Sequence, residues 1–482
     1  MSNATRPFCK PGNIFGINGW GALFPDVVLA FFTLFSFYKI GNKVANKEVS
    51  KWWILLYIGS WLPHFYFKTG LIDPLFNLLI FLAIYHVYAL SNNETNRSKH
   101  RLLAGLFLGL AVLTKGPVAI LIAILCLAVY LIVTKFKSAI RIKDVLLISL
   151  VSFGVVFIWF ATVLLKHGLA YGNWFLNEFI TYQIRLFRTE DADHGGPFVY
   201  HFIVLLIGCF PASLFLFKKH KENKNVLFNT WMWISLAVVL LLFSIVKTKI
   251  VHYSSFCYFP LSYLAAYNIS LIISNRETIS RWVKILLYSI GSIWSIVWIS
   301  LPLIGIYKNK LIPFIEDPFA VGNLQAPVQW SFYEIGIGFV YLIGLCYIIF
   351  KLNSNFEYYC KRLIAFQVIF IFICSNYFTP KIEQYSQGAA IAYYQSFKDK
   401  DVFVEPLSYK SYAHLFYTNK IKSTKDAFDT LGQSGYWTPN GNIQRPSYFI
   451  CKIMDTTIYT NNTHIQKMGE KNGFVFYKGL KD

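Results

Sequence analysis

Charged residues are scarce in this sequence. Of its 482 residues, 14% are charged, whereas 55% are hydrophobic and 18% are aromatic; a soluble domain carries about a quarter of charged residues. The apolar residues form several runs of about 17–25 residues, the length that an α-helix needs to cross a bilayer, and short Lys-rich or Arg-rich pieces separate these runs. The composition therefore excludes an ordinary soluble protein and predicts a protein with many membrane-spanning helices.

The sequence also lacks the features of nucleic-acid-binding and metal-centred proteins. Its formal charge is +21, but most of the excess lies in short loops between apolar runs, and no compact basic domain carries it. Five of the eight cysteines lie inside apolar runs, and none occurs in a CxxC or Cys/His spacing that suggests zinc or a redox centre. We find no internal repeat and no low-complexity segment. Nucleic acid is therefore not an expected partner.

The apolar runs predict an all-α membrane domain of about twelve transmembrane helices. Their approximate ranges are 21–40, 52–68, 72–90, 102–115, 117–134, 145–165, 198–217, 226–246, 252–274, 282–305, 331–350 and 362–378. The loops between them alternate, because one set is rich in Lys and Arg and the other holds a few scattered cations. By the positive-inside rule the first set is cytoplasmic.

This orientation places the loop 166–198 and the chain after the twelfth span outside the cytoplasm. The N-terminus is outside as well, with no signal peptide before it, so we expect a first helix to be missing. We assign residues 1–378 to the transmembrane domain. Residues 379–482 are predicted to form a small soluble extracytoplasmic α/β domain, with strands at DVFVEP, SYFICKI and GFVFYKG and helices at QGAAIAYYQSF and YKSYAHLFY.

The longest polar interruption among the apolar runs is the outer loop from Lys166 to Phe198. Its aromatic residues recur at helical spacing from Trp174 onward, which predicts a helix lying in the membrane interface. Arg185 and Arg188 fall on one face of that helix. They are either a solvated, headgroup-binding face or a clamp for a phosphate, which Arg binds in a bidentate manner. His194, in a His-Gly-Gly-Pro turn, is a weaker candidate for a metal ligand or a catalyst.

The other cations on the outer side each have a structural and a functional interpretation. Lys115, in LTKGP, is either a snorkelling lysine at a tight turn between helices or a cation at the rim of an outer cavity. Lys247 and Lys249, followed by Tyr253, favour an anion site over a simple interface anchor. Asp73, in TGLIDP, suits a helix N-cap with proline at the first helical position, and a functional role stays open.

Together these segments resemble a known family. WFLNEFITYQIRLFRTEDADHGGPF, GLAVLTKGP, FKTGLIDP and KTKIVHYSSFCYFP resemble bacterial membrane glycosyltransferases with the C-type fold. Among these enzymes they are similar to the aminoarabinose-to-lipid-A transferases and the protein O-mannosyltransferase-like group. The resemblance covers about Arg6 to Tyr267. It implies transfer of a sugar from a polyprenyl-phosphate carrier to a hydroxyl of a lipid (lipid A-like), glycan or protein acceptor on the outer face of the membrane.

The resemblance also implies roles for individual residues. Lys10, in RPFCKPG, matches the family's loop lysine that contacts the carrier phosphate. Tyr253 and the pair Arg185 and Arg188 match positions near that phosphate, and Asp73 matches the family's Asp-Pro aspartate. The family's first helix and its outer loop with the acceptor-activating aspartate are not found here. The acidic residues that could replace this aspartate are Glu178, Glu190, Asp191 and Asp193.

We therefore expect a glycosyltransferase of the plasma (inner) membrane that acts by inversion at the anomeric carbon, with Lys and Arg holding the departing phosphate. A monomer is expected, and no cofactor is implied apart from a divalent metal, which occurs in some relatives. Two alternatives stay open: a transporter or flippase of lipid-linked sugars, and a relative that has lost catalysis together with the loop aspartate. The sequence does not identify the sugar, the acceptor or the length of the carrier.

Overall fold

The structure is a computed structural model that describes residues 16, 18–92, 94–188, 195–217, 226–409, 411–419 and 446–480. Within these ranges, the side chains of residues 170, 182–188, 217 and 226 fall outside the description. The described chain packs as two compact units. The first contains Trp20–Gly291 and Leu345–Ile371, and the second contains Ser292–Gly344 and the chain from Phe372 onward. The division falls inside three long helices, which contribute to both units.

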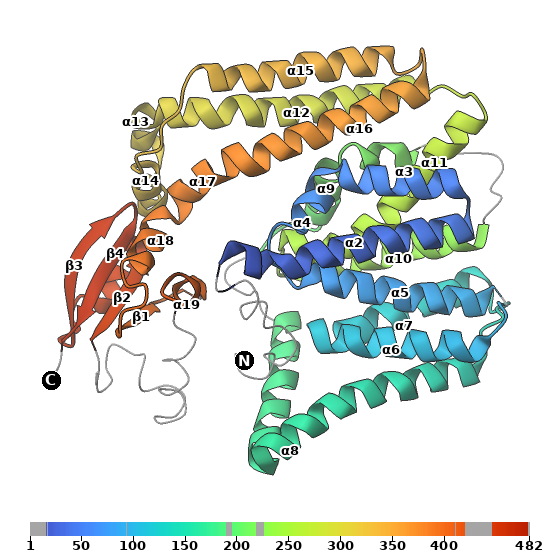
Figure 1. Cartoon of the computed structure of the whole chain (residues 1–482), viewed down its shortest axis with the longest axis horizontal. Helices are drawn as coiled ribbons and strands as arrows, with labels where there is room; N and C mark the ends of the chain where they lie inside the picture. The colour runs from blue at the N-terminus through green and yellow to red at the C-terminus, as the bar shows by residue number, and fades with distance from the viewer. Residues whose placement is uncertain are drawn as a thin grey trace. The chain divides into compact units, whose positions relative to one another are not determined.

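Most of the first unit is helical (Figure 1). Its elements in chain order are α2 (Gly19–Val44), α3 (Lys47–Ile58), α4 (Trp61–Tyr66), α5 (Asp73–Ser91), α6 (Arg97–Lys115), α7 (Val118–Val133), α8 (Ile142–Arg188), α9 (Tyr200–Gly208), η1 (Ala212–Phe217), α10 (Val226–Ile245), η2 (Val251–Cys257) and α11 (Tyr258–Ser274). The three shared helices are α12 (Arg281–Ile306), α15 (Tyr333–Lys351) and α16 (Phe356–Ile373).

Within the described residues, 8 helices are long and apolar enough to cross a membrane. They are Gly19–Val44, Asp73–Ser91, Ile142–Leu169, Leu227–Ile245, Val251–Ser274, Arg281–Ile306, Tyr333–Lys351 and Phe356–Ser386. The prediction of an integral membrane protein built from many apolar helices is therefore confirmed.

The remaining four predicted spans are helical but shorter or less apolar. The run 52–68 is divided into α3 and α4 at Gly59, and the run 198–217 is divided into α9 and η1 near Pro211. Helix α7 has 16 residues, and α6 carries cations in its first turns. The number of twelve spans stays a prediction.

Helix α8 contains a sharp bend at Gly168, which Figure 1 shows as a change of direction in the ribbon. Gly168 has φ 79° and ψ 169°, a conformation that is essentially restricted to glycine. The segment after the bend folds back, because the ring of Phe175 lies 5.5 Å from that of Trp159 and 6.0 Å from that of Phe160. The helix that the aromatic spacing predicted in the loop 166–198 is therefore present to Arg188.

An aromatic core joins α2, α3, α5 and α11 in the first unit. The ring of Phe37 stacks on Trp53 at 4.1 Å and contacts Phe81 and Phe259 edge-on at 6.0 and 4.9 Å. Trp53 also donates a hydrogen bond to the hydroxyl of Ser262 at 3.0 Å. Buried aromatic rings dominate such packing because each one buries a large area and prefers edge-on or offset contacts.

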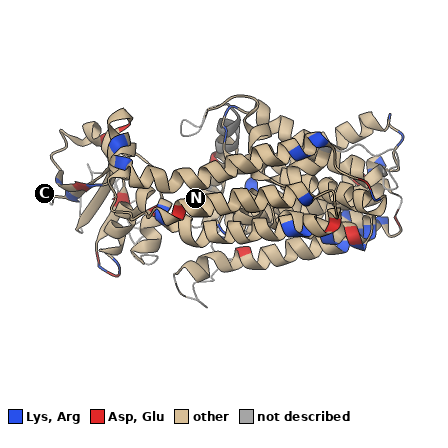
Figure 2. Ribbon diagram, turned by 90° about the horizontal axis from the view of Figure 1, so that it is seen from above, with Lys and Arg blue, Asp and Glu red and all other residues tan. Residues whose placement is uncertain are grey.

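The Lys and Arg residues of the first unit gather toward one end of its helices (Figure 2). Some of them are neutralised there: Asp144 is fully buried and pairs with Arg97 and with the Nε of Arg101, the latter at 2.6 Å. These ion pairs join α6 to the start of α8. The charges that suggest membrane orientation thus also fasten helices to one another.

The second unit carries a four-stranded sheet of order β1-β2-β4-β3. Its strands are β1 (Phe403–Pro406), β2 (Ser447–Lys452), β3 (Ile465–Lys471) and β4 (Phe474–Gly479); β1 runs parallel to β2, and the other pairs are antiparallel. Helices α17 (Thr379–Ser386), α18 (Gly388–Gln395) and α19 (Ala413–Tyr417) precede or separate the strands, and the π-helical turn η4 (Cys374–Phe378) and the 3-10 turn η5 (Ile453–Tyr459) complete this part. The predicted small α/β fold at the C-terminal end is confirmed. Strand β3 was not predicted.

Candidate functional site

Asp73 and Lys115 form a partly buried ion pair where α5 begins and α6 ends. Asp73 is the first residue of α5 and is 3% exposed, and Lys115 is the last residue of α6. The Lys115 amine pairs with the Asp73 carboxylate. The sequence suggested that Asp73 caps its own helix, but the residue before α5 is Ile72 and no side-chain cap is present. The Asp73 carboxylate is used in a tertiary contact, not as an N-cap.

Tyr253 completes this cluster. The Lys115 amine lies 5.3 Å from the centre of the Tyr253 ring and 5.6 Å from that of Phe76. A cation over aromatic faces is attracted by the negative face of each ring, and more strongly where water is excluded. Three residues that the sequence singled out separately, Asp73, Lys115 and Tyr253, are therefore in contact although they come from three elements, α5, α6 and η2.

Hydrogen bonds behind the cluster hold these elements in place. The hydroxyl of Ser255, in η2, accepts hydrogen bonds from Tyr66 at 2.8 Å and from the amide of Asn77 at 3.0 Å. Tyr66 also interacts with Asp73. Ser255 is buried, as are Tyr66 and Asn77. Helices α4 and α5 are thus tied to η2, which fixes the position of Tyr253 relative to Lys115.

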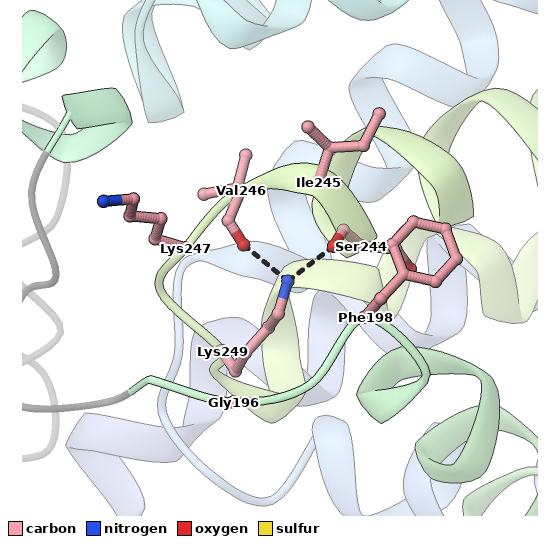
Figure 3. A pocket seen from close by; sticks show the side chains of 7 residues that line it. All are labelled: Gly196, Phe198, Ser244, Ile245, Val246, Lys247 and Lys249. Atoms are coloured by element: carbon pink, nitrogen blue, oxygen red, sulfur yellow. Dashed lines mark hydrogen bonds between the residues drawn. The ribbon is translucent and has the colours of Figure 1, made fainter.

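A pocket of about 430 Å³ lies at the end of α10 (Figure 3). It is lined by Gly196, Phe198, Ser244, Ile245, Val246, Lys247 and Lys249. The ring of Phe243, adjacent to the pocket residue Ser244, lies 5.4 Å from the ring of Tyr253. The predicted cations Lys247 and Lys249 therefore line one pocket, and Phe243 links the helix end at that pocket to Tyr253 of the cluster.

The two pocket lysines differ in their environment. Lys249 is 6% exposed, and its amine donates hydrogen bonds to the carbonyl oxygens of Phe243, Ser244 and Val246 at the end of α10. Burial lowers the pKa of this amine. Lys247 is exposed, and Figure 3 shows its side chain directed away from that of Lys249. Of the two, Lys247 is the more accessible to an anion.

Two further polar atoms near the pocket were not predicted from the sequence. The hydroxyl of Ser244 and the Nε2 of His201 are buried and have no hydrogen-bond partner within the described chain. His201 Nδ1 lies 3.0 Å from the hydroxyl of Ser254. A buried polar group without a partner lowers the stability of the fold by about 1–3 kcal/mol, so a ligand that formed a hydrogen bond with it would be stabilised. No sequence pattern marks them, because a serine and a histidine inside apolar runs are common.

Asp26 is a buried acid that the sequence reasoning missed. It lies in the apolar helix α2 directly after Pro25 and is 7% exposed. The backbone N–H of Gly70 interacts with its carboxylate, and one carboxylate oxygen has no partner among the described residues. Gly70 belongs to the turn that leads into Asp73. A carboxylate in an apolar span is costly and is a functional candidate by default, and that signal was available in the sequence.

Other predicted residues lie outside the described part of the chain. These are Lys10, Glu190, Asp191, Asp193 and His194. Arg185 and Arg188 belong to the last turns of α8, but their side chains are not described. Glu178 is exposed on the same helix. The part of the chain that the structure describes contains no group of three or more His, Cys, Asp or Glu residues suited to a metal ion.

The sequence is similar to known membrane glycosyltransferases over part of its length. Residues 12–159 match the family model described as dolichyl-phosphate-mannose-protein mannosyltransferase. The chain is 26% identical over 289 residues to the undecaprenyl phosphate-alpha-4-amino-4-deoxy-L-arabinose arabinosyl transferase of Wigglesworthia glossinidia brevipalpis, a match that covers 58% of this chain and 50% of that protein. The corresponding transferase of Pectobacterium carotovorum is 27% identical over 300 residues, covering 59% and 51%. The matched part thus spans about half the length of these relatives.

The fold has a close counterpart among solved structures. The structure of ArnT from Cupriavidus metallidurans bound to undecaprenyl phosphate superposes with a TM-score of 0.67 at 13% identity, covering 98% of this chain and 86% of that one. The apo structure of the same protein gives a TM-score of 0.65. Such a low identity supports the fold alone. The chain therefore has the fold of the C-type membrane glycosyltransferases, and over more than half of its length its sequence resembles the aminoarabinose transferases.

Proposed function

We propose that this protein transfers a sugar from a polyprenyl-phosphate donor to a lipid, glycan or protein acceptor. The observation that carries the proposal is the partly buried Asp73–Lys115–Tyr253 cluster together with a lysine-lined pocket, at the ends of apolar helices. A phosphate attached to a long isoprenoid chain fits this site. The cations stabilise the negative charge of the phosphate, and the isoprenoid chain can lie in the lipid that surrounds the apolar helices. The relatives' names, which include undecaprenyl phosphate and aminoarabinose, agree with this donor class.

The proposed reaction is a direct displacement. The acceptor oxygen forms a bond to the anomeric carbon, and the bond from that carbon to the phosphate oxygen breaks. The phosphate leaves with the bonding electrons, so its negative charge grows in the transition state. Cations already in place stabilise that charge without reorganisation. Lys247 is the accessible pocket cation for this role, and Arg185, Arg188 and Lys10 remain proposed donor-phosphate contacts.

Lys115 and Lys249 are proposed to contribute differently. The Lys115 amine already pairs with Asp73 and lies over Tyr253, so it is held at one position and supplies a fixed field. Lys249 donates to three carbonyl oxygens. It therefore shapes the pocket wall, and a phosphate contact from its amine would require at least one of these hydrogen bonds to be exchanged.

The acceptor hydroxyl must lose a proton, and we propose Asp26 as the carboxylate that takes it. One carboxylate oxygen of Asp26 is buried without a partner among the described residues. The contact between this carboxylate and Gly70 supports a position of Asp26 beside the turn that leads to Asp73. Proton transfer by a positioned carboxylate contributes about 10²–10⁴-fold to a rate. Glu178, exposed on α8, and the acidic residues 190, 191 and 193 are the alternatives from the sequence.

The test is transfer of a radiolabelled sugar from undecaprenyl phosphate by the purified full chain in nanodiscs, with lipid A as one acceptor. We expect wild-type transfer. Lys115→Met should lower kcat/KM by about 10²-fold, the scale on which removing one transition-state charge contact acts. A wild-type chain that transfers no sugar from any polyprenyl-phosphate donor, across lipid, glycan and peptide acceptors, would refute the proposal.

Asp26 is tested in the same assay. Asp26→Asn should reduce kcat by about 10²-fold or more with a nearly unchanged donor KM, because proton transfer and not donor binding is lost. Asp26→Glu should retain part of the activity. Glu178→Gln tests the alternative base on α8 in the same assay, and it should leave kcat nearly unchanged if Asp26 is the base. If Asp26→Asn kept full kcat while the wild type was active, the base would be a different residue and the transferase proposal would stand.

We also propose that the protein is a monomer of the plasma (inner) membrane with its C-terminal sheet outside the cytoplasm. The support is the concentration of Lys and Arg toward one end of the first unit's helices (Figure 2), since such residues favour the cytoplasmic side.

A further inference from the structure

The segment between α12 and α15 presents large apolar side chains although it belongs to neither span. It contains α13 (Lys308–Leu311), η3 (Ile312–Phe314) and α14 (Pro318–Leu324). Phe314 is 86% exposed and Phe332 is 64% exposed. Tyr307 and Leu311 are exposed as well. We name residues 307–332 the connecting segment.

These exposed rings are not a sign of a loosely held loop. Asp317 caps α14 through the N–H of Phe319 at 2.9 Å, and the Lys308 amine donates to the carbonyl of Ala326 at 2.6 Å. Trp330 donates to the hydroxyl of Tyr385 at 3.0 Å. A Cβ at Gly305 would lie 2.0 Å from this Trp330 ring, so the ring sits directly on the end of α12. Several hydrogen bonds and close contacts thus hold the connecting segment in place, while the side chains of Phe314 and Phe332 remain exposed.

Another side of the connecting segment packs on the C-terminal sheet. The Phe319 ring contacts Phe474 of β4 edge-on at 5.2 Å, and the Lys452 amine lies 5.1 Å from the centre of the Phe319 ring. A Cβ at Gly322 would lie 2.4 Å from the backbone nitrogen of Gly473. The two backbones approach so closely that neither position tolerates a side chain. The connecting segment therefore holds the sheet on one side and offers aromatic rings on another.

We infer that the connecting segment lies in the membrane interface, with Phe314 and Phe332 inserted among the lipids. The apolar surfaces of α12 and α15 support lipid as the occupant: Ile304, two residues before α12 ends, and Phe339, in the second turn of α15, are both exposed, and both helices are apolar enough to span a membrane. The connecting segment continues that lipid-facing surface.

Its composition fits the same place. Aromatic residues concentrate at the boundary between acyl chains and headgroups, and lysines beside them extend toward water. Lys310 lies 5.4 Å from the centre of the Tyr307 ring in this way. The consequence goes beyond sugar transfer: the packing of Phe319 and Gly322 on β4 and its preceding turn would keep the C-terminal sheet at the membrane surface.

The experiment uses photo-crosslinking by p-benzoylphenylalanine in the full chain, reconstituted in nanodiscs with tritium-labelled phosphatidylglycerol. The probe replaces Phe314 or Phe332. Tyr412 is the negative control, because it is an equally exposed aromatic residue (74%) of the same unit but lies outside the connecting segment. Ile343, exposed on the span α15, is the positive control.

We expect lipid labelling at positions 314 and 332 that approaches the level at 343 and exceeds that at 412, because side chains inserted at the interface contact acyl chains. Labelling no higher than at 412 would overturn the inference. Adducts with a second protein or a second copy of the chain in place of lipid would also overturn it. Because the readout needs no enzymatic activity, its outcome is independent of the proposed transfer reaction.

Discussion

At the residue scale, lysines that look equivalent in the sequence have different environments in the structure. Lys247 and Lys249 are two residues apart, yet one is exposed at the pocket and the other is buried against carbonyl oxygens. Lys115 was one of several cations interrupting apolar runs, and its partner Asp73 lies 42 residues away in the chain. Spacing alone could not distinguish these roles, because the distinction depends on which helix end each side chain reaches.

Substituting the two pocket lysines should therefore have different effects. Lys249→Met leaves three carbonyl oxygens at the end of α10 without this donor and should lower the free energy of unfolding by about 1–3 kcal/mol. Lys247→Met should change it by less than about 0.5 kcal/mol, as is usual at exposed positions, while lowering kcat/KM for the donor, because a cation that stabilises the departing phosphate is lost.

Thermal unfolding in detergent and donor titration of the transfer reaction provide the two measurements. Each variant is the control of the other, because the same change is made in the same pocket. Equal losses of stability would contradict the environments described here.

At the element scale, two glycines of α6 control how closely it approaches α8. A Cβ at Gly109 would lie 2.8 Å from the carbonyl oxygen of Ser152 and 2.7 Å from the Cβ of Val155. Gly105 meets Ile148 and Val151 in the same way. Small residues four apart allow such close packing of membrane helices. Hydropathy alone marks 102–115 as an apolar run and does not show that these two glycines meet α8.

Gly109→Ala should force α6 and α8 apart and lower stability by about 1–3 kcal/mol, the range for overpacking a tight contact. Gly154→Ala is the matched control, because nothing lies within 4 Å of a Cβ at that position of α8. Alanine there should leave stability unchanged or raise it, since alanine favours helix over glycine.

Unfolding of both variants can be followed by circular dichroism in the same detergent. If Gly109→Ala were as stable as the wild type, the packing of α6 on α8 would be looser than the structure shows. A loss in Gly154→Ala would indicate a contact that the described residues do not contain.

At the scale of the whole molecule, orientation remains a proposal that can be measured directly. Fusing alkaline phosphatase to the C-terminus should give active enzyme, and fusing green fluorescent protein there should give a dark product, because the first works only outside the cytoplasm and the second only inside. The expected result follows from the distribution of Lys and Arg. The opposite pair of signals would reverse the assignment of the pocket to the outer face.

The sequence by itself determined the membrane class, the positions of the long apolar helices and most of the C-terminal sheet. These follow from local patterns: runs of apolar residues, alternating strands and turn residues. It also indicated Asp73, Lys115 and Tyr253 as candidate site residues, partly through the resemblance to the membrane glycosyltransferases.

Only the tertiary structure decided which of these residues meet. The pairing of Asp73 with Lys115 and the burial of Asp26 beside Gly70 each join residues that are far apart in the chain. Such contacts depend on helix register, on bends such as Gly168 and on glycines that permit close approach. Those are properties of packed helices, and no single segment contains them.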